Sequence, residues 1–95
     1  MADRAQYIAR TLIARLANLQ ASFLEDGRGE PDRRHRIEVI EKVLAVELGI
    51  TNGASSALLE AAAPNVKASN QIPEQEIAAF AEFLRRHLGT HLAEP

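Results

Sequence analysis

Apolar residues recur with the period of an α-helix along most of this chain, and the widest apolar surface belongs to residues 32–48. At about 100° per residue, one stripe contains Ile37, Ile40, Leu44 and Leu48, and a second stripe beside it contains Val39, Val43 and Val46. A helix on the outside of a small bundle needs only one such stripe. We therefore expect this helix to contact two surfaces, its own core and something else.

The first 25 residues predict an ordinary amphipathic helix that begins after Asp3 as N-cap and ends near Glu25. Its apolar stripe contains Ile8, Leu12, Leu16, Leu19 and Phe23, and Arg4, Arg10, Thr11, Arg15, Asn18 and Ser22 share the opposite face. Residues 26–31 predict a loop, because two glycines and a proline interrupt the pattern. We place Pro31 in the first turn of the next helix, and Gly49 just past its end with a positive φ.

The second half of the chain predicts two further helices. A short one covers about 54–63, residues 64–72 form an irregular connection, and Pro73 opens a helix that Gly89 ends, which leaves a loose tail over 90–95. The predicted fold is all-α, a compact four-helix domain over 1–95 with a short third helix and no sheet. Its core should contain Ile8, Leu12, Leu16, Leu19, Phe23, Ile37, Ile40, Leu44, Leu48, Leu58, Ile77, Phe80, Leu84 and Leu88.

Composition narrows the classes of protein that this chain can represent. Eleven basic and thirteen acidic residues give a formal charge of −2, so no overall field attracts nucleic acid or an anionic membrane. The absence of cysteine excludes disulfides and thiolate chemistry. No apolar run approaches the roughly 20 residues of a membrane span, and Met1 precedes a polar segment, so we expect a cytoplasmic protein. Seventeen alanines, with nine arginines against two lysines, suggest a bacterial source and close helix packing.

Signatures of enzymes are missing from the sequence. It contains no glycine-rich phosphate loop, no nucleophile elbow and no paired histidine and carboxylate. We therefore assign no catalytic residue, no cofactor and no metal. His87 and His91 lie four residues apart, but Gly89 separates them, and the acidic residues 26–32 lack the spacing of a calcium loop.

The leading hypothesis is a non-enzymatic interaction protein, either a homodimer or a small adaptor or inhibitor of a larger partner. Its predicted interface is Val39, Val43, Val46, Glu47 and Arg36, with Glu47 of one copy facing Arg36 of the other across an antiparallel crossing. Glu47 can instead reach solvent at the end of its helix. Another alternative is that the first or the fourth helix covers the second stripe within one chain.

The runner-up is a small nucleic-acid-binding regulator with a helix-turn-helix-like segment over 39–63. Asn52, Ser55 and Ser56 would then contact DNA, although the second helix of this segment carries Glu60 and no basic residue. The basic cluster Arg33, Arg34 and His35 offers a weak anion site at a helix start. The alternative is that neighbouring acidic residues balance the positive charge of this cluster, and that no anion binds there.

Overall fold

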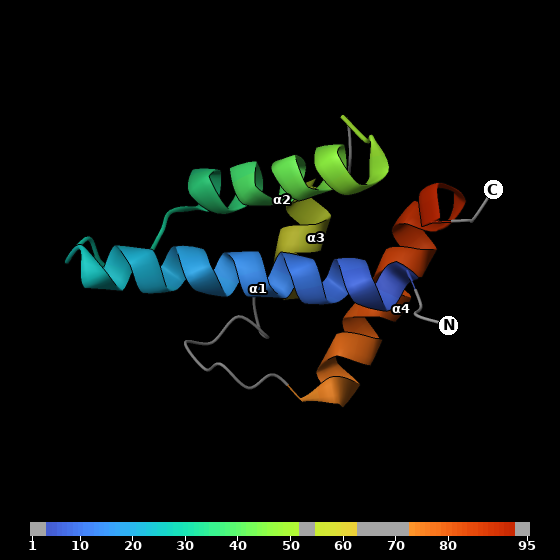
Figure 1. Ribbon diagram of the computed structural model, residues 1–95, viewed down its shortest axis with the longest axis horizontal. Coiled ribbons are helices and arrows are strands. Elements are labelled where there is room, and N and C mark those ends of the chain that lie inside the picture. Colours follow the sequence, from blue (N-terminus) through green and yellow to red (C-terminus); the bar gives the residue numbers. More distant parts are fainter. Residues whose placement is uncertain (1–3, 52–54, 63–72, 93–95) are drawn as a thin grey trace.

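The structure is a computed structural model that describes residues 4–51, 55–62 and 73–92 (Figure 1). Its elements are α1 (Arg4–Glu25), α2 (Arg33–Leu48), α3 (Ser55–Ala62) and α4 (Glu74–Leu92). These residues contain no strand, so the predicted all-α, four-helix fold is confirmed. Within the same ranges, no helix is long and apolar enough to cross a bilayer.

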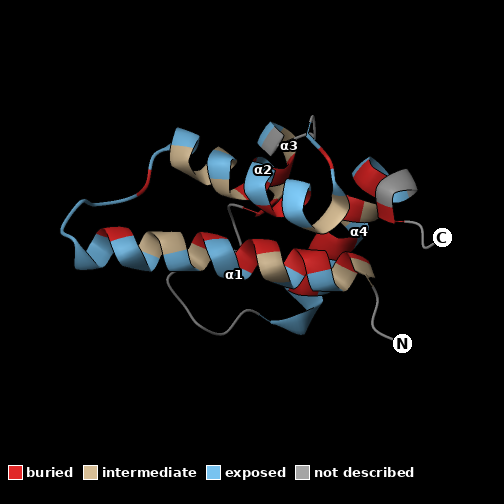
Figure 2. Ribbon diagram, turned by 45° about the horizontal axis from the view of Figure 1, so that its top comes forward, coloured by how far each residue is buried: buried red, intermediate tan, exposed pale blue. Residues whose placement is uncertain are grey.

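Helices α1 and α2 run antiparallel, side by side (Figure 1). Arg4 at the start of α1 reaches the end of α2, while Phe23 near the end of α1 contacts His35 at the start of α2. The last helix, α4, crosses the N-terminal half of α1 and packs against it more extensively than any other pair of helices. The short helix α3 bridges α2 and α4. The buried residues of α1 accordingly concentrate in its N-terminal half (Figure 2).

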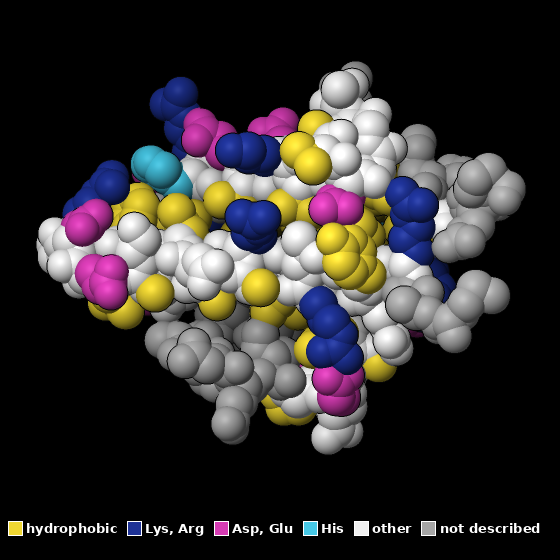
Figure 3. Space-filling model, viewed as in Figure 1, with side chains coloured by type: hydrophobic (Ala, Val, Ile, Leu, Met, Phe, Trp, Pro, Cys, Tyr) yellow, Lys and Arg dark blue, Asp and Glu magenta, His cyan; other side chains and the backbone are white. Residues whose placement is uncertain are grey.

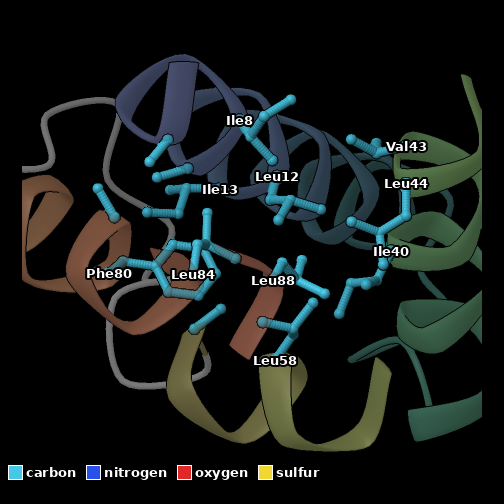
Figure 4. Packing of buried hydrophobic residues seen from close by; sticks show 14 of the residues in the cluster. Ile8, Leu12, Ile13, Ile40, Val43, Leu44, Leu58, Phe80, Leu84 and Leu88 are labelled. Atoms are coloured by element: carbon cyan, nitrogen blue, oxygen red, sulfur yellow. The ribbon is translucent and has the colours of Figure 1, made fainter. Parts of the chain in front are cut away.

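The core forms where side chains from all four helices converge (Figure 4). The largest fully buried side chains are Ile8, Leu12, Ile13, Ile40, Leu44, Leu58 and Leu84. Of the predicted core, Leu19, Ile37 and Leu48 are only half-buried, and the others are buried. Ile13 lies beside the predicted stripe of α1, yet it is only 1% exposed, because α4 covers that side of the helix.

The start of α2 differs from the prediction by one position. Asp32 is the N-cap, in extended conformation, and its side chain accepts a hydrogen bond from the backbone N–H of His35 at 2.9 Å. Pro31 therefore precedes the cap, and its predicted place in the first helical turn is wrong. The pyrrolidine ring is buried, so Pro31 packs against the domain before the helix begins.

The end of α2 is the predicted one. Gly49 has a φ of 67°, as expected of a glycine that ends a helix, and its N–H bonds the carbonyl of Ala45. The left-handed conformation of Gly49 turns the chain back on the helix. The N–H of Ile50 then donates to the carbonyl of Leu44 at 3.2 Å, and the Ile50 side chain is buried in the core.

The end of α4 was predicted wrongly. The helix kinks at Leu88, where φ is −127° and ψ is 21°, and continues through Gly89 to Leu92. Residues 90–92 are therefore helical rather than a loose tail. The kink allows Leu92, which is 9% exposed, to join the hydrophobic core. Asp3, the connection 64–72 and residues 93–95 lie outside the described residues.

Candidate functional site

The second apolar stripe of α2 has two environments. Val43 is 7% exposed and Val39 is half-buried, whereas Val46 is 73% exposed. Helix α1 lies along this side of α2 and covers the first two valines, so the stripe is buried mostly within one chain. This is the arrangement that the sequence left open as an alternative to a dimer. Val46 is the most exposed residue of the stripe, and part of Val39 also remains uncovered.

A groove separates the solvent-facing edges of α1 and α2, with a volume of about 360 Å³. It is lined by Thr11, Arg15, Asn18 and Leu19 from α1, and by Val39, Lys42, Val43, Val46 and Glu47 from α2. Hydrophobic side chains follow the junction of the two helices, and basic side chains lie over them (Figure 3). The groove therefore combines an apolar floor with polar walls.

Two side chains of α1 contact Glu47 at one end of the groove. Tyr7 donates its hydroxyl hydrogen bond to Oε1 of Glu47 at 3.4 Å, and Nη2 of Arg4 donates to the Glu47 backbone carbonyl at 3.0 Å. The guanidinium of Arg4 also opposes the negative end of the α2 dipole. Glu47 thus has a partner inside its own chain, whereas the sequence suggested Arg36 of a second copy.

The walls of the groove carry two cations, Arg15 from α1 and Lys42 from α2. Arg15 and Lys42 are both exposed, and neither forms an ion pair within the described part of the chain. By contrast, Arg10 pairs with Glu74, and this carboxylate raises the pKa of Arg10. The groove therefore carries two cations against one lining carboxylate, that of Glu47, which accepts a hydrogen bond from Tyr7.

The basic cluster at the start of α2 is surrounded by acids. Arg33 lies 3.9 Å from Glu60, Arg34 lies 3.6 Å from Glu38, and Nδ1 of His35 lies 2.7 Å from Oδ1 of Asp32. The backbone N–H of His35 and then its side chain lower the pKa of Asp32, because both stabilise the carboxylate. Each predicted anion-binding side chain therefore has a carboxylate beside it, which competes with an incoming anion.

The helix-turn-helix-like segment does pack as a pair of helices. Ile50 and Leu58 are buried between α2 and the rest of the core. Ser56 is exposed, while Asn52 and the side chain of Ser55 lie outside what the structure describes. Glu60 is also exposed on α3. A carboxylate on this helix would repel the phosphates of a nucleic acid.

The predicted histidine pair is not brought together as a site. His87 stacks on Phe83 with ring centroids 4.1 Å apart, and its Nδ1 lies 3.1 Å from the Phe83 carbonyl. The side chain of His91 is not among those described. Within the described residues, no cluster of three or more histidine or carboxylate side chains could hold a metal ion.

No protein-family model, no curated protein and no solved structure matches this chain with significant similarity.

The α1 half of the groove was missed by sequence reasoning. Thr11, Arg15 and Asn18 were assigned to the solvent face opposite the stripe of α1. In the structure α2 packs toward one edge of that stripe, so these polar residues become a groove wall. Periodicity gives the apolar direction of a helix, but the side on which a neighbour packs depends on the tertiary crossing. No local signal in the sequence indicated this wall.

Proposed function

We propose that this chain is a non-enzymatic binding module, a small adaptor or inhibitor, that contacts another protein through the groove between α1 and α2. The observation that carries the proposal is Val46, which is 73% exposed beside an open apolar floor. Exposed valines are ordinary when they occur singly. Val46, however, borders a groove of about 360 Å³ and extends the apolar surface of that groove.

A second apolar side chain supports the same location. Of the described residues, three large hydrophobic side chains are exposed: Tyr7, Leu24 and Val46. Tyr7 is joined to Glu47 at one end of the groove, and Val46 lies in its wall. Clustering of apolar surface at one place is typical of interaction sites.

The polar groups of the groove favour binding over catalysis. Its hydroxyl group belongs to Thr11, which donates to the Tyr7 carbonyl at 2.9 Å. A nucleophile needs a base within hydrogen-bond reach, and the described residues of the groove include no such pair.

Charge favours a different protein over a second copy. A self-complementary dimer through this groove would gather two copies each of Arg15 and Lys42, four cations, against the two carboxylates of Glu47. Like charges that face each other across an interface oppose association. The homodimer predicted from the sequence therefore becomes the weaker form of this proposal. A nucleic-acid-binding regulator has less support, because Glu60 is exposed on α3 and lies beside Arg33.

The experiment is site-specific photocrosslinking in an extract of the source cells. A benzophenone side chain replaces Val46, and the matched control carries it at Ala79, which is exposed on α4. We expect a discrete adduct with one polypeptide at position 46 and none at position 79. Excess unlabelled wild-type protein should suppress this adduct, whereas excess Val46→Lys protein should not. The same adducts at both positions would contradict the proposal.

A further inference from the structure

We infer that the part of the partner seated in the groove is an amphipathic helix with acidic residues flanking its apolar stripe. This inference rests on the proposed function and specifies the chemistry of the partner. Shape supplies the first argument. Helices α1 and α2 run antiparallel and side by side (Figure 1), and the groove follows about two turns of each, from Thr11 to Leu19 and from Val39 to Glu47. A third helix fills such a groove when its apolar residues, spaced three and four apart, meet an apolar floor.

The floor of this groove suits such a stripe. Leu19 comes from α1, and Val39 and Val43 come from α2, so apolar surface is available from both walls. Leu19 and Val39 are only half-buried, which leaves part of each side chain for a ligand to cover. Val46 extends the floor toward solvent. A helix on this floor would bury apolar surface that α1 and α2 do not bury against each other.

Charge supplies the second argument. Arg15 lies on the α1 wall and Lys42 on the α2 wall, so the apolar floor has one cation on each side. Both are exposed and without an ion pair among the described residues, whereas Arg10, Arg33 and Arg34 each lie beside a carboxylate. Glutamates on both flanks of a docked helix would meet these two cations. Such complementarity selects the partner more than it adds affinity.

The test uses three synthetic helical peptides with the same leucine stripe and with Glu, Gln or Lys on both flanks. Fluorescence anisotropy measures their binding to the full chain. We expect the Glu peptide to bind, the Gln peptide to bind several-fold more weakly and the Lys peptide more weakly still. These differences correspond to two exposed ion pairs, each of modest strength.

Charge reversal makes the test specific to the groove walls. The double variant Arg15→Glu/Lys42→Glu should bind the Glu peptide about tenfold more weakly than the wild type does. It should bind the Lys peptide more tightly, because the charges of the groove walls are now attractive to lysine and repulsive to glutamate. Arg86→Glu, a reversal at an exposed position on α4, is the control and should leave the order unchanged. Unaltered helical circular dichroism verifies that each variant is folded. Chemical-shift mapping should place the Glu peptide on the residues of the groove.

Three results would overturn the inference. Equal binding of the Glu and Lys peptides would remove the role of charge. A dimer that Val46→Glu dissociates would show that a second copy of the chain, and not the helix of a partner, occupies the groove. Protection of the groove by dodecanoate, with no peptide bound, would assign it to a small amphiphile. If a polypeptide crosslinks at position 46 while the peptides fail, the inference falls and the proposed function stands.

Discussion

Val43 and Val46 belong to the same predicted stripe, yet they lie in opposite environments. They are three residues apart, which is about 300° around the helix, or 60° in the other direction. That small rotation carries Val46 past the edge of α1, so its exposure rises to 73% while that of Val43 stays at 7%. The edge of the neighbouring helix thus decides whether a hydrophobic residue of the stripe belongs to the core or to the surface.

This difference predicts unequal effects of the same substitution. Val43→Asp should lower the free energy of unfolding by about 3 kcal/mol or more, because it buries a charge with no partner. Val46→Asp should change it by no more than about 0.5 kcal/mol, as expected at an exposed position. Urea denaturation followed by circular dichroism measures both. Equal losses would show that Val46 is packed against something in the isolated protein.

Asp32 predicts a dependence of stability on pH. Its pKa is lowered in the folded chain, mainly by the N–H of His35, so folding favours the ionised form. The contribution is complete above the ordinary carboxyl pKa near 4 and is lost as the pH falls through the lower, folded value. Asp32→Asn keeps a capping oxygen but no charge, so it should melt a few degrees lower at pH 7. We expect the two melting temperatures to converge as the pH falls through the lowered pKa of Asp32, because both caps then become neutral. A constant difference across this range would contradict the argument.

At the scale of the elements, periodicity located all four helices to within one or two residues at most ends. Apolar residues three and four apart identify a helix without any knowledge of its neighbours, as in α1. The errors involve tertiary contacts. Pro31 precedes its helix and is buried, and Gly89 does not end α4, because the burial of Leu92 favours a kinked continuation. A glycine in the sequence cannot by itself show whether it ends a helix or lies within one.

The two helix glycines should therefore respond oppositely to a side chain. An added Cβ meets no atom within 4 Å at Gly49 or at Gly89, so backbone conformation decides both effects. Gly49 has a φ of 67°, and Gly49→Val should cost more than about 1 kcal/mol. Gly89 has no positive φ, and Gly89→Ala should stabilise by about 0.5–1 kcal/mol. Thermal unfolding measures both, and destabilisation by Gly89→Ala would restore the predicted helix end.

At the scale of the whole molecule, half of the candidate site could be predicted from the sequence. The wide apolar arc of α2 indicated Val39, Val43 and Val46, and its polar edge indicated Glu47. The other wall, with Arg15, depends on how α1 crosses α2, and no helix pattern contains that information. For the same reason the sequence could not distinguish burial of the second stripe by α1 from burial by a second chain.

At this scale the prediction concerns the oligomeric state of the isolated protein. Since α1 covers Val39 and Val43, and Arg15 and Lys42 would repel their counterparts, we expect the isolated 10.4 kDa chain to sediment as a monomer. Sedimentation velocity over a concentration series, extended to high micromolar protein, measures this directly. Raised salt serves as the control, because screening weakens the repulsion between exposed cations. A stable dimer at low salt would return the homodimer to first place.

The packing of α1 against α4 has a consequence for synthesis on the ribosome. The first helix rests most extensively on the last one, and residue 92 follows residue 25 by 67 positions along the chain. At roughly 5–20 residues per second, α1 exists for about 3–13 s before α4 has been made. During that interval Ile8, Leu12 and Ile13 have no native surface to cover them from that side. The nascent chain therefore depends on α2, on chaperones or on the ribosome surface to shield its first helix until α4 has been made.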